Sequence, residues 1–156
     1  MDLNKLTLGD RVVGVSAILF LIFMFFPWFS YDVGGFEIGD QSGFDFFLFG
    51  WIPLLLAIAM VAQIGLTRFS DTRLPAVGSL TWGQVHLILG AIAAVLVILK
   101  LLIGDDAGAG PLEVDGDRSI GIFLATIAAL GLVAGGALKM RDPADAGAGG
   151  APPPRP

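Results

Sequence analysis

The chain contains no cysteine and few charged residues. Without cysteine, disulfide bonds, thiolate nucleophiles and thiolate metal ligands are excluded. Charged residues make up 15% of the 156 positions, and 14 acidic groups against 9 basic ones give a net charge of −5. A chain with this balance lacks the basic surface that binding to nucleic acid requires. The scarcity of charge therefore directs attention to the apolar segments.

Charge is absent from four long stretches. Residues 12–31, 46–67, 74–99 and 119–138 are uncharged for 20, 22, 26 and 20 positions respectively. A hydrocarbon core about 30 Å thick is crossed by roughly 20 apolar residues of helix. A chain of this length cannot bury four wholly apolar helices in a soluble core. The segments also lack the strict alternation of membrane strands, so the pattern predicts membrane-spanning helices.

We therefore predict an all-α membrane protein with one domain, residues 1–141, built as an antiparallel four-helix transmembrane bundle. A Pro- and Gly-rich tail, residues 142–156, has no apolar surface to bury and is predicted to be disordered. The expected spans are residues 11–30, 45–66, 81–103 and 119–139.

The distribution of Lys and Arg predicts the orientation of the chain. Seven of the nine basic residues lie before the first span, between the second and third, or after the fourth. Short loops rich in Lys and Arg stay in the cytoplasm. We expect a multi-pass protein of the cell membrane with cytoplasmic N- and C-termini and two acidic outer loops. The acids of the second outer loop do not fit a calcium-binding loop, and no metal or cofactor is expected.

Hydroxyl and proline residues mark where the predicted helices begin and bend. Thr7–Asp10, Ser42–Asp45 and Thr81–Gln84 each resemble a capping box, in which two side chains satisfy backbone donors at a helix start. Pro27 is expected to end or bend the first span, and Pro53 to kink the second.

Aromatic side chains are expected at the membrane surfaces. Trp28, Tyr31 and Trp51 would lie at the outer headgroup level, because amphipathic rings favour that depth. Trp82 would lie at the inner one.

Two short similarities suggest that the halves of the chain are related. Residues 6–9 resemble residues 80–83, and residues 36–38 resemble residues 112–114. A duplication would give two equivalent helical hairpins related by a twofold axis along the membrane normal, and the two outer segments would pair as a small β-ribbon. Independent solution of the same capping problem by both hairpins explains the similarity equally well.

Small residues predict where the helices touch. Lipid supplies no hydrophobic force between helices, so close backbone approach at Gly and Ala favours association. We expect the third and fourth spans to pack through such a face, and self-association through the fourth span is the competing interpretation. The predicted packing face consists of Gly83, Gly90, Ala94, Gly121, Ala125, Ala128, Gly131 and Gly135.

Three polar residues are predicted to gather inside the membrane near its cytoplasmic face. Ser16, Gln63 and His86 lie at similar depths in the first three spans. We expect His86 to be a neutral imidazole bonded to Gln63 or to a backbone carbonyl, while handling of protons or substrate is the functional alternative. No Asp or Glu lies within any span, so the buried glutamate on which small four-span multidrug exporters depend is missing.

Gly9-Asp10-Arg11 followed by Phe25-Phe26-Pro27-Trp28-Phe29 resembles the first span of small uncharacterised bacterial four-span membrane proteins. The resemblance covers mainly the first 30 residues and the Pro/Gly-rich tail. It implies a bacterial inner-membrane setting and brings no activity with it.

No nucleophile–base pair or ligand set can be assembled from these residues. The sequence thus favours a non-enzymatic small membrane component, in contact with membrane lipid, that self-associates as a homo-oligomer or joins an unknown membrane protein partner. A transporter or channel subunit for an uncharged or weakly charged small solute is the alternative.

Overall fold

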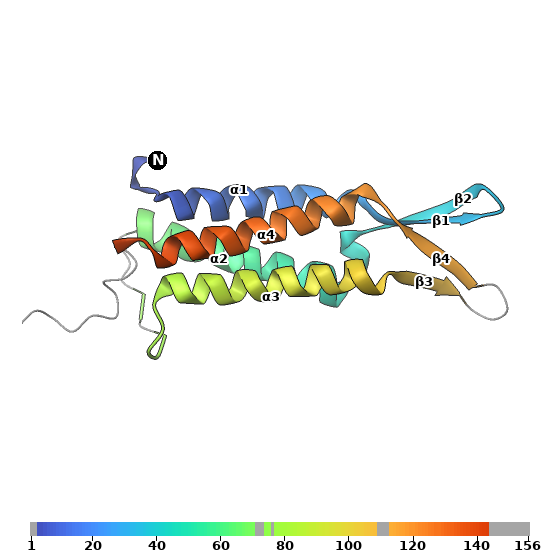
Figure 1. Cartoon of the computed structure of the whole chain (residues 1–156). Helices are drawn as coiled ribbons and strands as arrows, with labels where there is room; N and C mark the ends of the chain where they lie inside the picture. Colours follow the sequence, from blue (N-terminus) through green and yellow to red (C-terminus); the bar gives the residue numbers. More distant parts are fainter. Residues whose placement is uncertain (1–2, 71–73, 76, 109–112, 144–156) are drawn as a thin grey trace, which may run out of the picture.

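Four helices run side by side along one axis, and a small sheet extends from one end of the bundle (Figure 1). The computed structural model describes residues 3–70, 74–75, 77–108 and 113–143, so most of the predicted disordered tail lies outside the described residues. The helices of this part are α1 (Leu8–Phe23), α2 (Ile52–Phe69), α3 (Trp82–Ile103) and α4 (Ile120–Met140). We call the end where α1 begins and α4 ends the terminal end, and the opposite one the sheet end.

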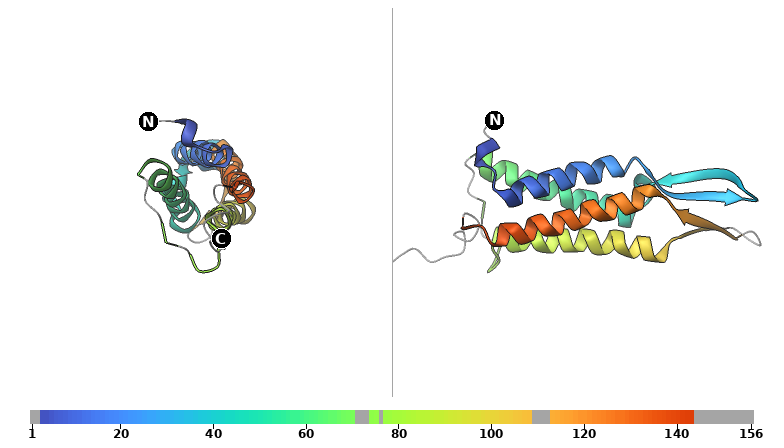
Figure 2. Two further views of the ribbon diagram at one scale, coloured as in Figure 1. Left: turned by 90° about the vertical axis from the view of Figure 1, so that its left-hand side faces the viewer. Right: turned by 45° about the horizontal axis from the view of Figure 1, so that its top comes forward.

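Seen along the axis, the helices form a ring in the order α1, α2, α3, α4 (Figure 2). Three helical segments in the described part are long and apolar enough to cross a membrane: Phe47–Phe69, Trp82–Ile103 and Ile120–Met140. By their length and composition, these three segments suggest a membrane protein. Helix α1 has only 16 residues, so a fourth span of full length is not present as predicted.

The first predicted span, residues 11–30, is wrong at its outer end. Helix α1 ends at Phe23, where the Met24 N–H donates to the Phe20 carbonyl. Pro27 then opens the strand β1 (Pro27–Val33). Proline has no N–H to continue a helical ladder, and the uncharged residues that follow it pair with neighbouring strands instead.

A widened turn directly precedes Pro53, where a kink was predicted. Residues Phe47–Trp51 form a π-helix that leads directly into α2. The Trp51 N–H donates to the Phe46 carbonyl five residues earlier, over 3.2 Å. Single π turns of this kind are local insertions within α-helices. This one leads into α2 just before Pro53, which has no backbone N–H to donate.

The outer segments form a four-stranded antiparallel sheet, so the protein is mostly helical, as predicted, but is not all-α. Its strands are β1, β2 (Phe36–Ser42), β3 (Asp105–Gly108) and β4 (Glu113–Arg118), in the order β2-β1-β4-β3. Strand β1 continues from α1, and β4 leads into α4. Because α1 and α4 are neighbours, β1 and β4 are delivered side by side and pair through Phe29–Arg118, Ser30–Asp117 and Tyr31–Gly116.

This strand order also corrects the predicted β-ribbon. Residues 36–38 pair with β1, and Val114 pairs with Ala107 of β3, so the two segments do not pair with each other. A twofold axis that exchanged the helical hairpins would map the central β1–β4 pair onto β3 and β2. Those two strands are the opposite edges of the sheet, so the sheet does not follow the symmetry that a duplication would impose.

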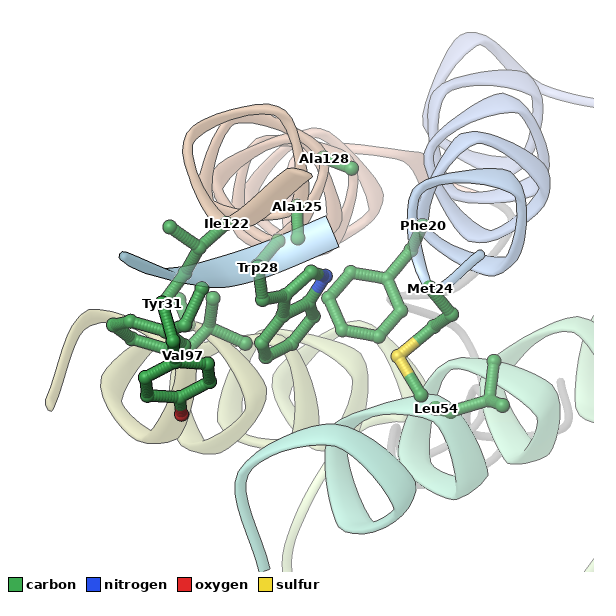
Figure 3. Close-up of a cluster of buried hydrophobic side chains, with 12 residues drawn as sticks. Phe20, Met24, Trp28, Tyr31, Leu54, Val97, Ile122, Ala125 and Ala128 are labelled. Carbon is green, nitrogen blue, oxygen red and sulfur yellow. The ribbon is translucent and has the colours of Figure 1, made fainter. Parts of the chain in front are cut away.

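The core is densest where the bundle meets the sheet (Figure 3). Trp28 is fully buried there, with Phe20 edge-on at 6.5 Å between ring centroids. Its indole N–H donates to the Phe23 carbonyl over 3.0 Å, which satisfies the one polar atom of the side chain. Tyr31 is also buried. Both rings are thus packed inside the protein, and their depth at the outer headgroup level stays a prediction.

The backbone of α4 lies in close contact with the backbones of α1 and α3. A Cβ atom added at Gly135 would lie 2.9 Å from the Val13 nitrogen of α1, and one at Gly90 of α3 would lie 2.9 Å from the Leu132 carbonyl carbon of α4. Gly83 also lies against α4, at Lys139 and Met140. The predicted partner of Gly135 was α3, which is wrong. Helix α4 uses separate faces, and its α3-facing glycine is Gly136, against Leu87.

A packing test of Gly135 needs a reference glycine that lies against no other helix. Gly65 of α2 is the suitable reference, because an added Cβ there meets nothing within 4 Å.

We expect Gly135→Ala to destabilise the bundle by about 1–3 kcal/mol, since the added methyl group meets backbone that cannot move aside. Gly65→Ala should be neutral or stabilising by up to about 1 kcal/mol, through helix propensity alone. Unfolding of both variants in detergent, followed by circular dichroism, measures the difference. Equal effects of the two substitutions would contradict backbone-close packing at Gly135.

Candidate functional site

The three residues predicted to form a polar cluster lie on different helices and have separate contacts. The His86 ring lies between two carbonyls, with Nδ1 3.0 Å from the Trp82 oxygen and Nε2 3.2 Å from the Met60 oxygen of α2. A neutral imidazole has one N–H and can donate to one of these two carbonyls. The contact of Nε2 with the Met60 oxygen places the ring of α3 against the backbone of α2.

Ser16 and Gln63 are buried but differ in their surroundings. Ser16 lies against Gly131 at the α1–α4 contact. The Gln63 side chain lies on α2, 8% exposed, and its Oε1 has no hydrogen-bond partner. Gln63 and His86 line one groove between α2 and α3, whereas Ser16 does not line it.

The strongest polar contact of the terminal end was not foreseen from the sequence. Asp10, in the first turn of α1, forms ion pairs with Lys139 of α4 and with Arg68 of α2, the latter at 2.7 Å. The Asp10 and Lys139 side chains are 0% and 1% exposed, and that of Arg68 is 16% exposed. One carboxylate thereby joins the ends of three helices.

Asp10 also caps the N-terminus of its own helix, α1. The Thr7 N–H donates to Asp10 Oδ2 over 3.1 Å, and the Asp10 N–H donates to Thr7 Oγ1 over 3.3 Å. The capping boxes predicted at Thr7–Asp10 and Thr81–Gln84 are confirmed. An acid at a helix start and cations at helix ends also complement the helix dipoles, so the ion pairs and the cap favour one conformation.

The charge of Asp10 is maintained by its partners. Burial raises the pKa of this carboxyl, but the hydrogen bond and charge of Lys139, the Thr7 N–H and Arg68 together hold the pKa below its ordinary value of 3.8. A carboxylate that accepts several donors is stabilised in its charged form. The contribution of Asp10 to stability is therefore complete above about pH 5, where the carboxyl is charged in both the folded and unfolded states, and it is lost as the pH falls through the lower folded-state pKa.

The two basic residues at the sheet end serve as caps of α3. Arg118 donates from Nε to the Leu101 carbonyl over 2.6 Å and from its guanidinium to the Leu102 carbonyl over 3.0 Å. Lys100 donates to the Gly104 carbonyl over 3.0 Å. The last carbonyls of a helix have no partner within it. Lys100 and Arg118 are the two basic residues that the sequence places outside the predicted cytoplasmic segments. Their hydrogen bonds to carbonyls at the end of α3 explain why they are there.

Lys100 lies in an aromatic enclosure beneath the sheet. Its ammonium group is 4.2 Å from the Phe46 ring centroid and 5.1 Å from that of Phe29, and it pairs with Asp105 at 2.6 Å. The Tyr31 hydroxyl also bonds Asp105. A cation between aromatic faces and a carboxylate is stabilised by both. The enclosure fixes the start of β3 to β1 and to the entrance of α2.

An exposed apolar surface occupies the far end of the β1–β2 hairpin. Val33, Phe36 and Ile38 are 48%, 78% and 61% exposed. Gly34 and Gly35, both at positive φ, form the two-residue turn between the strands. We call these three apolar side chains the hairpin tip. Acidic Asp32, Glu37 and Asp40 flank it, and residues 27–45 contain no Lys or Arg.

Within the described part of the chain, no group of three or more His, Asp or Glu side chains is placed to hold a metal ion. Asp10 and Lys100 are buried charges whose partners belong to other helices or strands, and each ties distant segments together.

We expect Asp10→Asn to destabilise the protein by about 3–5 kcal/mol at neutral pH, because the buried Lys139 ammonium loses its counter-charge. The variant should also lose stability less steeply than the wild type below pH 4, since it lacks the titrating carboxyl. Unfolding in detergent across a pH series measures both effects.

Asp45→Asn is the matched control, because Asp45 accepts the Ser42 N–H over 2.7 Å in an exposed turn. Its cost should stay below about 1 kcal/mol. A wild-type protein and an Asp10→Asn variant with the same acid profile would contradict the role given to Asp10.

The chain matches no family model, no curated protein and no solved structure. Its function is therefore argued from the geometry of the two bundle ends and the hairpin tip.

Proposed function

We propose that this protein is a non-enzymatic membrane component that joins a larger complex through its hairpin tip. The observation that carries the proposal is the exposure of Phe36 and Ile38 on a hairpin that projects beyond the end of the bundle (Figure 1). Exposed apolar side chains that gather on one element, rimmed by polar groups, are typical of protein interfaces. In this proposal α1 is the fourth, short span, both termini are cytoplasmic, and the tip projects into the space outside the membrane.

The acidic rim favours a different protein over a second copy as the partner. Two hairpins placed tip to tip would bring Asp32, Glu37 and Asp40 of each copy against the same acids of the other, and like charges at short range are destabilising. A partner with an apolar pocket rimmed by Lys or Arg would satisfy both the apolar and the acidic groups. Charge complementarity of this kind also speeds association.

The packing of the bundle supports a role in assembly over one in transport. Buried apolar side chains of all four helices fill the bundle, among them Val13, Leu54, Val97 and Leu132. A conduction pathway needs polar groups or water along a continuous cavity. The buried charges of the described part lie instead at the two ends, at Asp10 and at Lys100.

A photoreactive residue tests the partner directly. With p-benzoylphenylalanine in place of Phe36, irradiation of native membranes should give a covalent adduct with another protein, identified by mass spectrometry. The same residue in place of Val77, exposed at the terminal end, should not give that adduct. Adduct yield should fall as salt rises, because the acidic rim is screened. Adducts with lipid or with a second copy alone would overturn the proposal.

The orientation is testable because the chain has no cysteine. Single substitutions Ile38→Cys and Lys5→Cys place one thiol at each end. In intact cells a membrane-impermeant maleimide should label Ile38→Cys and leave Lys5→Cys unlabelled until the membrane is permeabilised. The reverse pattern would place the hairpin tip in the cytoplasm.

A further inference from the structure

The groove between α2 and α3 at the terminal end contains a polar atom without a partner. It has a volume of about 370 Å³ and is lined by Met60, Gln63, Leu66, Trp82, His86 and Leu89, among others. The walls are almost wholly apolar, yet Gln63 Oε1 is buried and accepts no hydrogen bond from the described residues. A buried acceptor left unsatisfied costs about 1–3 kcal/mol, so a ligand that donates to it gains affinity.

From these contacts we propose that the groove binds a membrane amphiphile with an uncharged, hydrogen-bond-donating head and a single apolar chain. The buried Gln63 amide would turn toward the groove so that the head donates to Oε1, and the chain would lie along Met60, Leu66 and Leu89. Among the described residues, no Asp, Glu, Lys or Arg side chain lines the groove, which favours an uncharged head. The volume falls within the range of pockets that hold small ligands.

The surroundings of His86 leave Gln63 as the group that selects the head. Both His86 ring nitrogens lie against backbone carbonyls, at Trp82 and Met60, so the ring is held in place as part of the wall. Trp82, in the first turn of α3 and at the depth expected for the inner membrane surface, covers the groove on the terminal side. Indole rings favour that depth, which places the donating head near the interface and the chain toward the bilayer centre.

The similar groove between α1 and α2 provides a contrast within the same molecule. It has a volume of about 310 Å³ and is lined only by aliphatic residues such as Ile18, Leu54 and Val61. It therefore offers an acyl chain no polar group to recognise. The presence of Gln63 in one groove and of no counterpart in the other makes the proposed selectivity a property of the α2–α3 groove.

Two probes that differ in one hydrogen-bond donor test the proposal. Binding of 1-dodecanol and of its methyl ether to the full-length protein in detergent micelles is measured by native mass spectrometry. We expect the wild-type protein to bind the alcohol about three- to tenfold more tightly, the range for one additional hydrogen bond to a buried acceptor. Equal binding of the two probes would overturn the proposal, since water alone would then satisfy Gln63.

Substitutions assign the preference to the groove. Gln63→Leu keeps the size of the side chain and should bind both probes equally, whereas Thr126→Val, which removes a hydroxyl bonded to the Ile122 carbonyl within α4, should keep the preference for the alcohol. A diazirine-bearing dodecanol should label peptides that contain residues 59–66 or 82–89. Labelling confined to other helices, or a preference that persists in Gln63→Leu, would refute the site even if the hairpin tip proved to bind a protein.

Discussion

Backbone contact along α4 is the constraint from which the other features of the structure follow. Gly135 allows α4 to lie against α1, and Gly136 allows it to lie against α3. In lipid, where apolar side chains gain nothing by leaving the solvent, such contacts supply the packing that holds helices together. The close α1–α4 pair determines that β1 and β4 form the centre of the sheet. The same pair brings Asp10 within reach of Lys139.

The buried charges of the described part occupy the two ends of the bundle, and each connects segments that the chain separates. Asp10 joins α1 to α2 and α4 at one end. Lys100 joins α3 to Asp105 and to the Phe46 ring at the other. Breaking a buried pair leaves an uncompensated charge, whereas the intact pair is a weak source of stability. These groups therefore act mainly to select one arrangement of helix ends over others that apolar packing alone would permit.

The charge-free stretches predicted the positions of α2, α3 and α4 because the length of an apolar run is a local property of the sequence. Helix starts at Thr7 and Thr81 were predictable for the same reason, since a capping box spans four residues. The sheet was not, because β1 begins inside an uncharged run and β3 and β4 are short and rich in Asp and Gly. Their pairing depends on which helices are neighbours.

The candidate sites show the same division. The depth of Gln63 and His86 could be estimated by counting residues, and both line one groove. The partners of Asp10 lie 58 and 129 residues away along the chain, and no local pattern marks such a pairing. The burial of Trp28 likewise depends on the turn after α1. The prediction placed Trp28 in a membrane-spanning helix, whereas it lies in β1.

The shortness of α1 has a consequence for the surrounding lipid. Its 16 residues extend about 24 Å, whereas the 22 residues of α3 extend about 33 Å. In the proposed arrangement, with α1 as the fourth span, a bilayer that fits α3 is too thick for α1, and exposed Phe25 just beyond α1 covers only part of the difference. Hydrophobic mismatch of this kind is relieved by local thinning of the bilayer or by tilt. The protein should therefore deform the membrane unevenly around its circumference, with the strongest thinning of the bilayer beside α1.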